Sequence, residues 1–595
     1  MNRNGSVRRP FLICRAGAAF DLIALIKKLS FFLAAALLAA PAFAQKAGKP
    51  LPRPRLVVGI VVDQMRYDYL YRYWDKYGND GFKRLLREGF SYESTHYNYV
   101  PTYTGPGHAS IYTGTTPATH GIVGNNWWLR DENRGTYVTE DKTVQPVGGT
   151  AAAGQQSPRH MLTTTIGDEL RLATNFQSKV VGVCIKDRGS ILPAGHAANA
   201  AYWYDGSNGA FITSTFYMNA LPDWVTKFNA QNRAASYLDQ PWQTLLPIAQ
   251  YTESTPDDVP WEGAFKGEDK PVFPHDLPRL SAAPTAAVKN NLQTAGETVP
   301  QATPRNLDLI RWTPFGNSLT ADFALEAVRA EQLGQRPGIT DMLAVSFSCT
   351  DYIGHQFGAS AIETEDTYLR LDRDLARLLA QLEKTVGKGQ TLVFLTADHG
   401  AAHAVDFLKS HRVPAGGVNV ALMRDSVERA LVRRYGPGKW VANLDNQQVY
   451  LNRPLIAQKG LALAQVQAEV AATLLKLPGI AQTMTATDLQ RTHWQQGPGM
   501  FQENGYHPAR SGDVLALLIP GWLEAYSYPV IKGTTHGTAS TYDTHVPLLF
   551  WGWHVPKGQS VAPARIVDIA PTVARWLHIQ EPNGCTGEPL SEVLK

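Results

Sequence analysis

Acidic residues and histidines stand just after three short apolar runs of this sequence. Each motif follows a strand-like run: Asp63 after 56–62, Asp351 and His355 after 342–347, and Asp398 and His399 after 392–395. In open α/β sheets, ligands bind beyond the carboxyl ends of parallel strands, so these side chains are expected to converge. His536 in KGTTHGTAS brings their number to six. Two sets of three Asp/His ligands suit two zinc ions that keep open positions for substrate, and manganese or cobalt could occupy the same ligands.

The segment from Val100 to Gly114, VPTYTGPGHASIYTG, places hydroxyl side chains before a Gly-Pro-Gly break. We expect Thr104 to cap the N-terminus of a helix, with backbone N–H groups free to face an anion. A helix N-terminus stabilises an anion by only about 0.3–2 kcal/mol. Lowering the pKa of an alcohol to near neutrality takes on the order of 10 kcal/mol, if it follows metal-bound water. We therefore expect a metal ion, and not the helix, to activate the threonine.

Short apolar runs rich in β-branched residues recur along the chain. They are typical of strands buried on both faces of a mainly parallel sheet. The runs cover residues 56–62, 180–185, 342–347, 392–395, 514–519 and 546–550. Helical patterns lie between them, for example at 82–90 and at 371–382, where Gly387 is placed to end the helix. This alternation predicts an α/β fold, a three-layer α/β/α sandwich around a mostly parallel sheet.

Two stretches interrupt the alternation. Residues 200–306 are rich in Pro, Trp and Asn, and their four tryptophans predict an ordered insertion or cap rather than a linker. Residues 425–505 form a second predicted α/β insertion, with one amphipathic helix from Leu463 to Leu474. The predicted division is a leader, a core in three parts and the two insertions: 1–44, 45–199, 200–306, 307–424, 425–505 and 506–595.

The N-terminal residues are typical of a secretory signal peptide. Lys27 and Lys28 precede an apolar run, and Ala42-Phe43-Ala44 supplies the small residues of a cleavage site. We expect cleavage after Ala44, a periplasmic or secreted protein and no membrane association after cleavage.

The chain has 56 basic and 52 acidic residues, and without the first 44 residues these become 50 and 51, a net charge of −1. This balance gives no electrostatic case for nucleic acid as a partner. The three remaining cysteines allow at most one disulfide.

Asp63 and the motifs TYTGPGH, GIVGNN, TDYIGH, TADHG and THG occur in the order and approximate spacing of the alkaline phosphatase superfamily. The chain most resembles the monomeric bacterial alkaline phosphatases with a threonine nucleophile, over essentially its whole length after the leader. The resemblance implies that Thr104, four residues before His108, is the nucleophile, with Thr102 the less favoured choice. Attack on phosphorus would give a phosphothreonine, which water then hydrolyses.

The resemblance also assigns the metal ligands. It implies one zinc ion held by Asp351, His355 and His536. It implies a second held by Asp63, Asp398 and His399, with the Thr104 oxygen presented to the metals.

Asn125, in GNNWW, stands where the superfamily's threonine phosphatases and nucleotide pyrophosphatases place an asparagine amide on a phosphoryl oxygen. Lys186 and Arg188, in VCIKDRGS, match the K-x-R pair of the monoesterases. They follow a predicted strand with one residue between them, so an extended backbone would point both side chains to one side. A phosphate monoester has one more anionic oxygen than a diester, and this pair would bind it.

Four further histidines are expected to pack or to position other groups. His108, His120 and His403 lie near the motifs. His545 is expected to be structural and is the second choice for a ligand if His536 fails.

The sequence therefore predicts an exported alkaline phosphatase with two zinc ions per chain. We expect a monomer that takes small-molecule phosphate monoesters and releases inorganic phosphate. The nearest alternative is a phosphodiesterase or nucleotide pyrophosphatase on the same core. A more distant one is an exported metal- or phosphate-binding protein without turnover. A sulfatase is disfavoured because the Cys-x-Pro-x-Arg pattern is missing, and a phosphoglycerate mutase because it would use serine.

Overall fold

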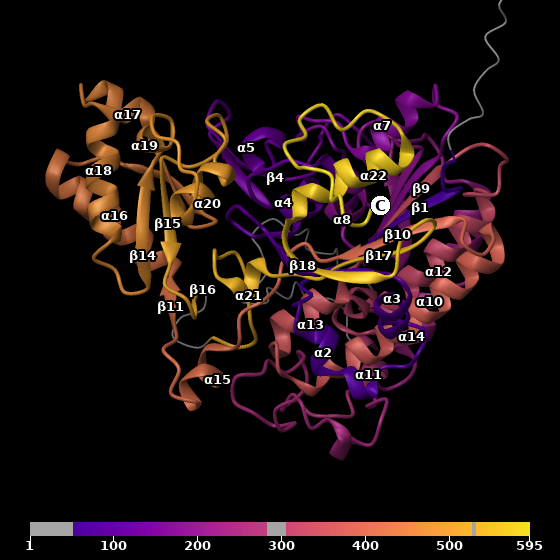
Figure 1. Ribbon diagram of the computed structural model, residues 1–595. Helices are drawn as coiled ribbons and strands as arrows, with labels where there is room; N and C mark the ends of the chain where they lie inside the picture. The colour runs from indigo at the N-terminus through magenta and orange to yellow at the C-terminus, as the bar shows by residue number, and fades with distance from the viewer. Residues whose placement is uncertain (1–51, 283–304, 526–530, 595) are drawn as a thin grey trace, which may run out of the picture. The chain divides into compact units, whose positions relative to one another are not determined.

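The computed structural model describes residues 52–282, 305–525 and 531–594. Its main element is a ten-stranded sheet (Figure 1). In sheet order the strands are β18 (Gly558–Arg565), β2 (Phe90–His96), β17 (Leu548–Gly552), β10 (Thr391–Thr396), β1 (Leu56–Val62), β9 (Asp341–Phe347), β6 (Val180–Cys184), β7 (Ala200–Asp205), β8 (Ala210–Ser214) and β5 (Pro146–Val147). The five central strands, from β10 to β7, are parallel to one another, and β17 runs antiparallel to β10.

The central strands are buried on both faces because helices cover both. Every residue of β1, β6, β9 and β10 is buried. One group of mutually packed helices contains α4 (Thr104–Thr113), α7 (Ile166–Ala173), α8 (Asp187–Ala194) and α22 (Ile569–Leu577). The other, across the sheet in Figure 1, contains α3 (Phe82–Glu88), α12 (Phe315–Ala330), α13 (Cys349–Phe357) and α14 (Ile362–Val386). The predicted α/β fold of three layers is confirmed, and α14 ends at Val386, with Gly387 as the cap residue that stops it, as expected.

A second sheet has its own core. It has the order β12 (Val441–Asp445), β13 (Gln448–Leu451), β15 (Val514–Leu518) and β14 (Ile480–Thr485), and it packs against α16 (Val420–Tyr435) and α18 (Leu463–Leu474). The strand predicted at 514–519 is β15, so the expectation that it joins the main sheet is wrong. A short apolar run indicates a buried strand but does not say which sheet buries it. This second sheet therefore takes strands from both sides of residue 505.

The stretch from residue 200 begins inside the main sheet, since β7 and β8 are two of its strands. Further along, Trp242 is fully buried and donates from Nε1 to Asp366, near the start of α14, at 2.7 Å. The tryptophan thus packs, as an ordered insertion requires. No helix within the described ranges has the length and apolarity needed to cross a membrane. The predicted signal peptide and its cleavage site lie outside the described residues.

Candidate active site

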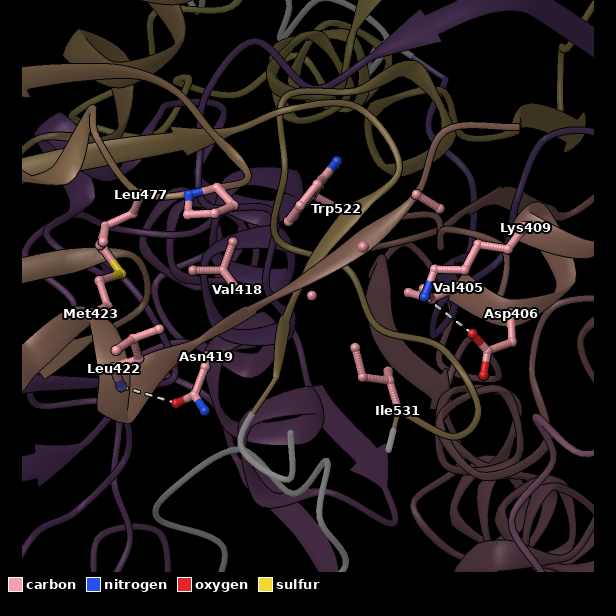
Figure 2. Close-up of a pocket in the computed structure, with 14 residues that line it drawn as sticks. Val405, Asp406, Lys409, Val418, Asn419, Leu422, Met423, Leu477, Trp522 and Ile531 are labelled. Carbon is pink, nitrogen blue, oxygen red and sulfur yellow. Dashed lines mark hydrogen bonds and ion pairs between the residues drawn. The ribbon is translucent and has the colours of Figure 1, made fainter. Parts of the chain in front are cut away.

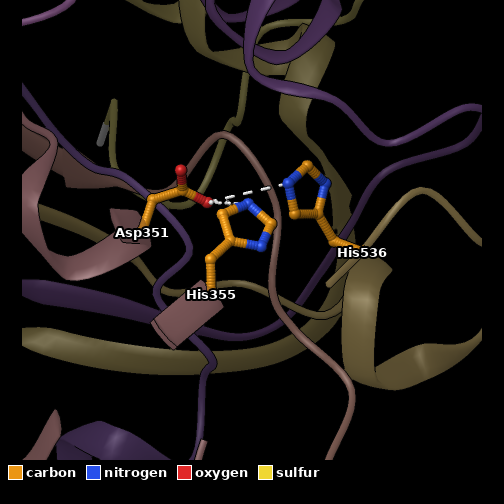
Figure 3. Close-up of side chains that lie close together, drawn as sticks. All are labelled: Asp351, His355 and His536. Carbon is orange, nitrogen blue, oxygen red and sulfur yellow. Dashed lines mark ion pairs between the residues drawn. The ribbon is translucent and has the colours of Figure 1, made fainter. Parts of the chain in front are cut away.

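The six predicted ligands form two compact groups at the carboxyl ends of the central strands. Asp351 and His355 lie one turn apart on α13, and His536 reaches them from the loop before α21 (Thr541–Thr544) (Figure 3). The other group is Asp63, just after β1, with Asp398 and His399, just after β10. Within each group the ligand atoms lie within 4.8 Å of one another, and all six residues are buried.

Backbone carbonyls fix the orientation of all three histidines of these groups. Nδ1 lies 2.8 Å from the Thr534 carbonyl in His355, 2.7 Å from that of Thr102 in His536, and 3.0 Å from that of Gly400 in His399. Because a carbonyl accepts a hydrogen bond, each Nδ1 carries a proton, and each Nε2 is the ring nitrogen left to bind a metal ion. This arrangement is typical of metal-binding histidines.

The carboxylates also fit a bound cation. Asp63 Oδ1 is buried and has no hydrogen-bond partner, and Asp398 Oδ2 is buried with only a 3.3 Å contact to His108 Nδ1, although such oxygens are costly to bury without partners. Burial, and then the charge of Asp398, raises the pKa of Asp63 well above its usual value. The donor set is Asp and His, which suits zinc. A divalent cation in the group of Asp63, Asp398 and His399 would satisfy these oxygens, and a cation in each group would offset the negative charge.

Lys186 joins the two groups. Its Nζ lies 2.7 Å from Asp63 Oδ2 and 2.5 Å from Asp351 Oδ2, and the side chain is buried. Burial disfavours the charged form of Lys186, but the Asp351 and Asp63 carboxylates outweigh this effect and raise the pKa of Lys186 above its usual value. On Asp351, burial is likewise outweighed, by the charges of His355 and Lys186, and its pKa is lowered. The lysine is therefore a buried cation between the two ligand groups.

Thr104 is the first helical residue of α4, so the prediction that it caps the helix is wrong: the cap residue is Tyr103. Its Oγ1 lies 3.4 Å from His399 Nε2. Gly107 allows this close approach, because a Cβ there would come within 2.3 Å of the Asp398 carbonyl oxygen. Thr102 instead donates its hydroxyl to the Thr538 carbonyl at 3.1 Å. Of the two threonines, Thr104 is the one whose hydroxyl lies beside a ligand.

Asn125 lies beside the start of α4. Its Oδ1 accepts a hydrogen bond from the Gly105 N–H at 2.8 Å. The expectation that the N–H groups at this helix start are free to face an anion is therefore wrong for Gly105. Its Nδ2 is buried and has no hydrogen-bond partner. An asparagine amide with one end fixed and two free protons is suited to donate to a ligand oxygen.

The extended Lys-x-Arg segment predicted from the sequence is wrong in one respect. Strand β6 ends at Cys184, Lys186 caps α8, and Arg188 lies in the first turn of that helix. Arg188 is buried and donates from Nη1 to the Tyr137 hydroxyl at 2.8 Å, and that hydroxyl donates to Asp187 Oδ1 at 2.6 Å. Helix geometry, rather than strand alternation, therefore orients the arginine.

The remaining histidines lie outside the two groups. His108 contacts the Thr104 carbonyl at 2.9 Å and Ser346 Oγ at 2.9 Å, so it braces α4 against β9. His545 contacts the Glu93 carbonyl at 2.9 Å. Burial lowers the pKa of His120 and of His403 to about 3, so both are neutral packing groups.

Comparisons with known proteins agree with this geometry. A family model described as type I phosphodiesterase / nucleotide pyrophosphatase matches residues 57–540. Alkaline phosphatase PafA of Elizabethkingia meningoseptica is 46% identical over 545 residues, 91% of this chain and 95% of the relative. The crystal structure of wild-type PafA superposes with a TM-score of 0.84 at 45% identity, covering 92% of this chain and 100% of that one.

The chain belongs to the alkaline phosphatase superfamily. Its similarity to PafA, in sequence and in structure, makes it a phosphate monoester hydrolase. A relative from Myroides odoratus, 46% identical over 557 residues that cover 93% of this chain and 97% of the relative, carries the name calcium-transporting ATPase.

One residue of the phosphatase site was missed from the sequence. Gln64, directly after Asp63, has a left-handed backbone with φ of 62°. It donates from Nε2 to Asp351 Oδ1 at 2.7 Å and from its backbone N–H to Asp398 Oδ1 at 3.1 Å. It therefore fixes one carboxylate of each group. Its position after a candidate ligand was the only signal in the sequence.

A hollow of roughly 360 Å³ lies between α15 (Val405–Ser410), β11 (Gly416–Asn419) and β16 (Trp522–Ala525) (Figure 2). Its wall is mainly apolar, with an Asp406–Lys409 ion pair at 3.3 Å. None of its lining residues is a candidate ligand or nucleophile. The cysteines that the structure describes, Cys184, Cys349 and Cys585, are all free thiols.

Proposed function

We propose that this alkaline phosphatase transfers the phosphoryl group of a small-molecule monoester first to Thr104 and then to water. The observation that carries the proposal is the position of the Thr104 hydroxyl, 3.4 Å from a ligand histidine and beside two buried groups of three ligands. A hydroxyl at a helix start, backed by an asparagine amide with free protons, is suited to receive a phosphoryl group.

In the first step, the bond from Thr104 Oγ1 to phosphorus forms as the bond to the leaving oxygen breaks, and the proton that the hydroxyl loses ends on the released alcohol. In the second, a water oxygen attacks the phosphothreonine, the bond from Oγ1 to phosphorus breaks, and the hydroxyl regains a proton as inorganic phosphate leaves. Asn125 donates from Nδ2 to a phosphoryl oxygen in both steps. Two protons of the Lys186 ammonium are used by Asp63 and Asp351, so its third is available to the substrate. With Arg188 it binds the anionic oxygen that is esterified in a diester.

Two zinc ions would be held by Asp351, His355 and His536 and by Asp63, Asp398 and His399. Bound there, they would lower the pKa of the threonine hydroxyl and stabilise charge on the phosphoryl oxygens. The ligand groups carry three carboxylates against one buried lysine, so a cationic site for a phosphate dianion needs the metals. We further propose that the protein is exported after cleavage at Ala44 and acts as a monomer. N-terminal sequencing of secreted material and its mass in solution check these two points.

Nitrophenyl phosphate and a nitrophenyl diester, assayed side by side at alkaline pH, test the proposal. We expect a strong preference for the monoester, loss of activity in chelator and its return with zinc. Preference for the diester would assign the chain to the phosphodiesterases that share its family model. Turnover that survives chelation, with no metal left on the protein, would overturn the metal assignment.

A further inference from the structure

The turn between β12 and β13 is an unusual hairpin tip. Its two residues, Asn446 and Gln447, both have left-handed backbones, with φ of 52° and 60°. Such two-residue turns favour Asn followed by Gly, and glutamine tolerates this conformation poorly. Both residues are also buried, at 7% and 4% exposure, whereas hairpin tips are normally exposed. A strained, buried, polar turn needs partners, and its partners lie beside the active site.

Asn446 contacts the backbone next to Asn125. Its Nδ2 donates to the Asn126 carbonyl at 2.6 Å. The neighbouring Gly124 makes room for it, since a Cβ at that position would lie 2.5 Å from the same nitrogen. The amide of Asn446 therefore fixes the backbone carbonyl of Asn126, the residue that follows Asn125.

Gln447 contacts the backbone next to His536. Its Nε2 donates to the Gly537 carbonyl at 3.3 Å. Its own carbonyl accepts from the Ala516 N–H on β15 at 2.9 Å, which ties the turn to the second sheet. The glutamine thus connects a metal-ligand loop to a strand of the second sheet.

A third contact runs through Glu524, on β16. Its Oε1 accepts from the Gln447 N–H at 3.0 Å, and its Oε2 accepts from the Tyr103 hydroxyl at 2.9 Å. Tyr103 caps α4 directly before Thr104, and its ring lies 5.4 Å from the ring of His536. The same turn is therefore connected to the residue before the nucleophile.

We infer that the Asn446–Gln447 turn, with Glu524, is a positioning device that holds Thr104, Asn125 and His536 in register for phosphoryl transfer. None of the three turn contacts touches the reacting atoms, and each fixes the residue next to one that does. The inference depends on the proposed roles of these residues. Errors of about 1 Å in such alignment cost about 100-fold in rate, which makes the turn a sensitive control point.

Asn446→Gly tests the first contact with little disturbance of the fold. Glycine adopts the left-handed backbone without strain, so the turn is kept and only the amide is lost. Asn232→Gly is the matched control, because Asn232 is exposed and has φ of 48°. We expect Asn446→Gly to lower kcat/KM on the monoester and to raise the inhibition constant of inorganic phosphate by about 10- to 100-fold, with zinc content unchanged. Gln447→Gly should instead release zinc to chelator about 10- to 100-fold more readily, as for lost supports of metal ligands.

A double-mutant cycle with Asn125→Ala separates this inference from the proposed function. If Asn446 acts through Asn125, the double variant should lose no more activity than Asn125→Ala alone. Additive losses, or an Asn446→Gly variant that matches the control, would overturn the positioning role. If Asn125→Ala itself leaves phosphate inhibition and turnover unchanged, the assigned role of Asn125 in the proposed function fails instead.

Discussion

Replacing Lys186 and Arg188 by alanine, singly and together, should divide monoesterase from diesterase activity. A charge-assisted hydrogen bond contributes about 1.5–3 kcal/mol, and each 1.4 kcal/mol is worth about tenfold in rate. Each single variant should therefore lose about 10- to 150-fold in kcat/KM on a monoester, and the double variant about 10²- to 10⁴-fold. In the diester the oxygen that these cations bind is esterified and uncharged, so its kcat/KM should change by less than about tenfold.

The two single variants are not equivalent in this structure. Lys186 neutralises Asp63 and Asp351, at 2.7 and 2.5 Å, so its loss leaves two buried carboxylates that only bound metal can offset. Arg188 donates to the Tyr137 hydroxyl instead. We therefore expect Lys186→Ala to destabilise the metal-free protein, whereas Arg188→Ala should reduce monoester turnover with metal content intact.

The assay compares a nitrophenyl monoester with a diester of the same nitrophenol, so that the leaving group is constant. Zinc per chain is measured for every variant, and Lys142→Ala, at an exposed lysine, controls for the loss of one positive charge. Equal losses on both substrates would refute the specificity argument. A fully active Arg188→Ala variant would remove the arginine from the phosphate site.

Three further results are expected. Thr104→Ala should lower kcat by more than about 10³-fold without loss of zinc, whereas Thr104→Ser should keep part of the activity. Mass spectrometry of acid-quenched wild-type enzyme should detect phosphothreonine. Chelation should lower the melting temperature as well as the activity. A metal ion that binds only the folded state, at a free concentration 1,000 times its dissociation constant, adds about 4 kcal/mol to the free energy of unfolding. An unchanged melting temperature after complete metal removal would contradict this expectation. Glu262→Gln should raise the melting temperature at pH 9 by roughly 1–3 °C and leave it unchanged at pH 5. Burial, and then the charge of Glu363, raises the pKa of Glu262 to about 10, so the folded protein favours the protonated carboxyl. The wild-type protein therefore loses folding stability as the pH rises from the unfolded-state pKa near 4.5 toward 10, and the glutamine variant does not. Identical melting temperatures for wild type and variant at both pH values would contradict this prediction.

The ligands were predictable because local sequence and sheet topology specify them together. Asp63 and Asp398 follow apolar runs that form neighbouring parallel strands, β1 and β10, and parallel strands bring their carboxyl ends to one edge. Asp351 and His355 needed only the i, i+4 spacing of one helical turn. His536 lies in a loop with no regular periodicity, so the sequence offered it as a sixth candidate, but only the resemblance grouped it with Asp351 and His355.

The errors arose where a short motif has more than one local solution. Lys186 and Arg188 were assigned to an extended segment, but Gly189 lets α8 begin at Asp187, since a Cβ there would lie 2.5 Å from Cys184 Sγ. Thr104 was predicted to be the cap residue of α4, but the helix begins one residue earlier than predicted. Tyr103 has the extended backbone of a cap residue, with ψ of 161°, and Thr104 is the first helical residue. Boundaries of this kind depend on tertiary packing that no window of the sequence contains.

The groups that position the site are harder to predict than the groups that react. The sequence indicates Asp63 and Asp398 as ligands, because they are carboxylates that directly follow predicted strands. Asn446 and Gln447, in contrast, are polar residues that occur in many surface turns. What distinguishes these two is their burial and left-handed backbone, which exist only once the second sheet has folded against the loops that follow Gly124 and His536. A second sheet that supplies no reacting group can therefore still control the reaction, because the reacting residues are aligned by the peptides beside them. For that reason we expect Asn446→Gly, which keeps the turn, to reduce catalysis more than a comparable change at the exposed Asn232.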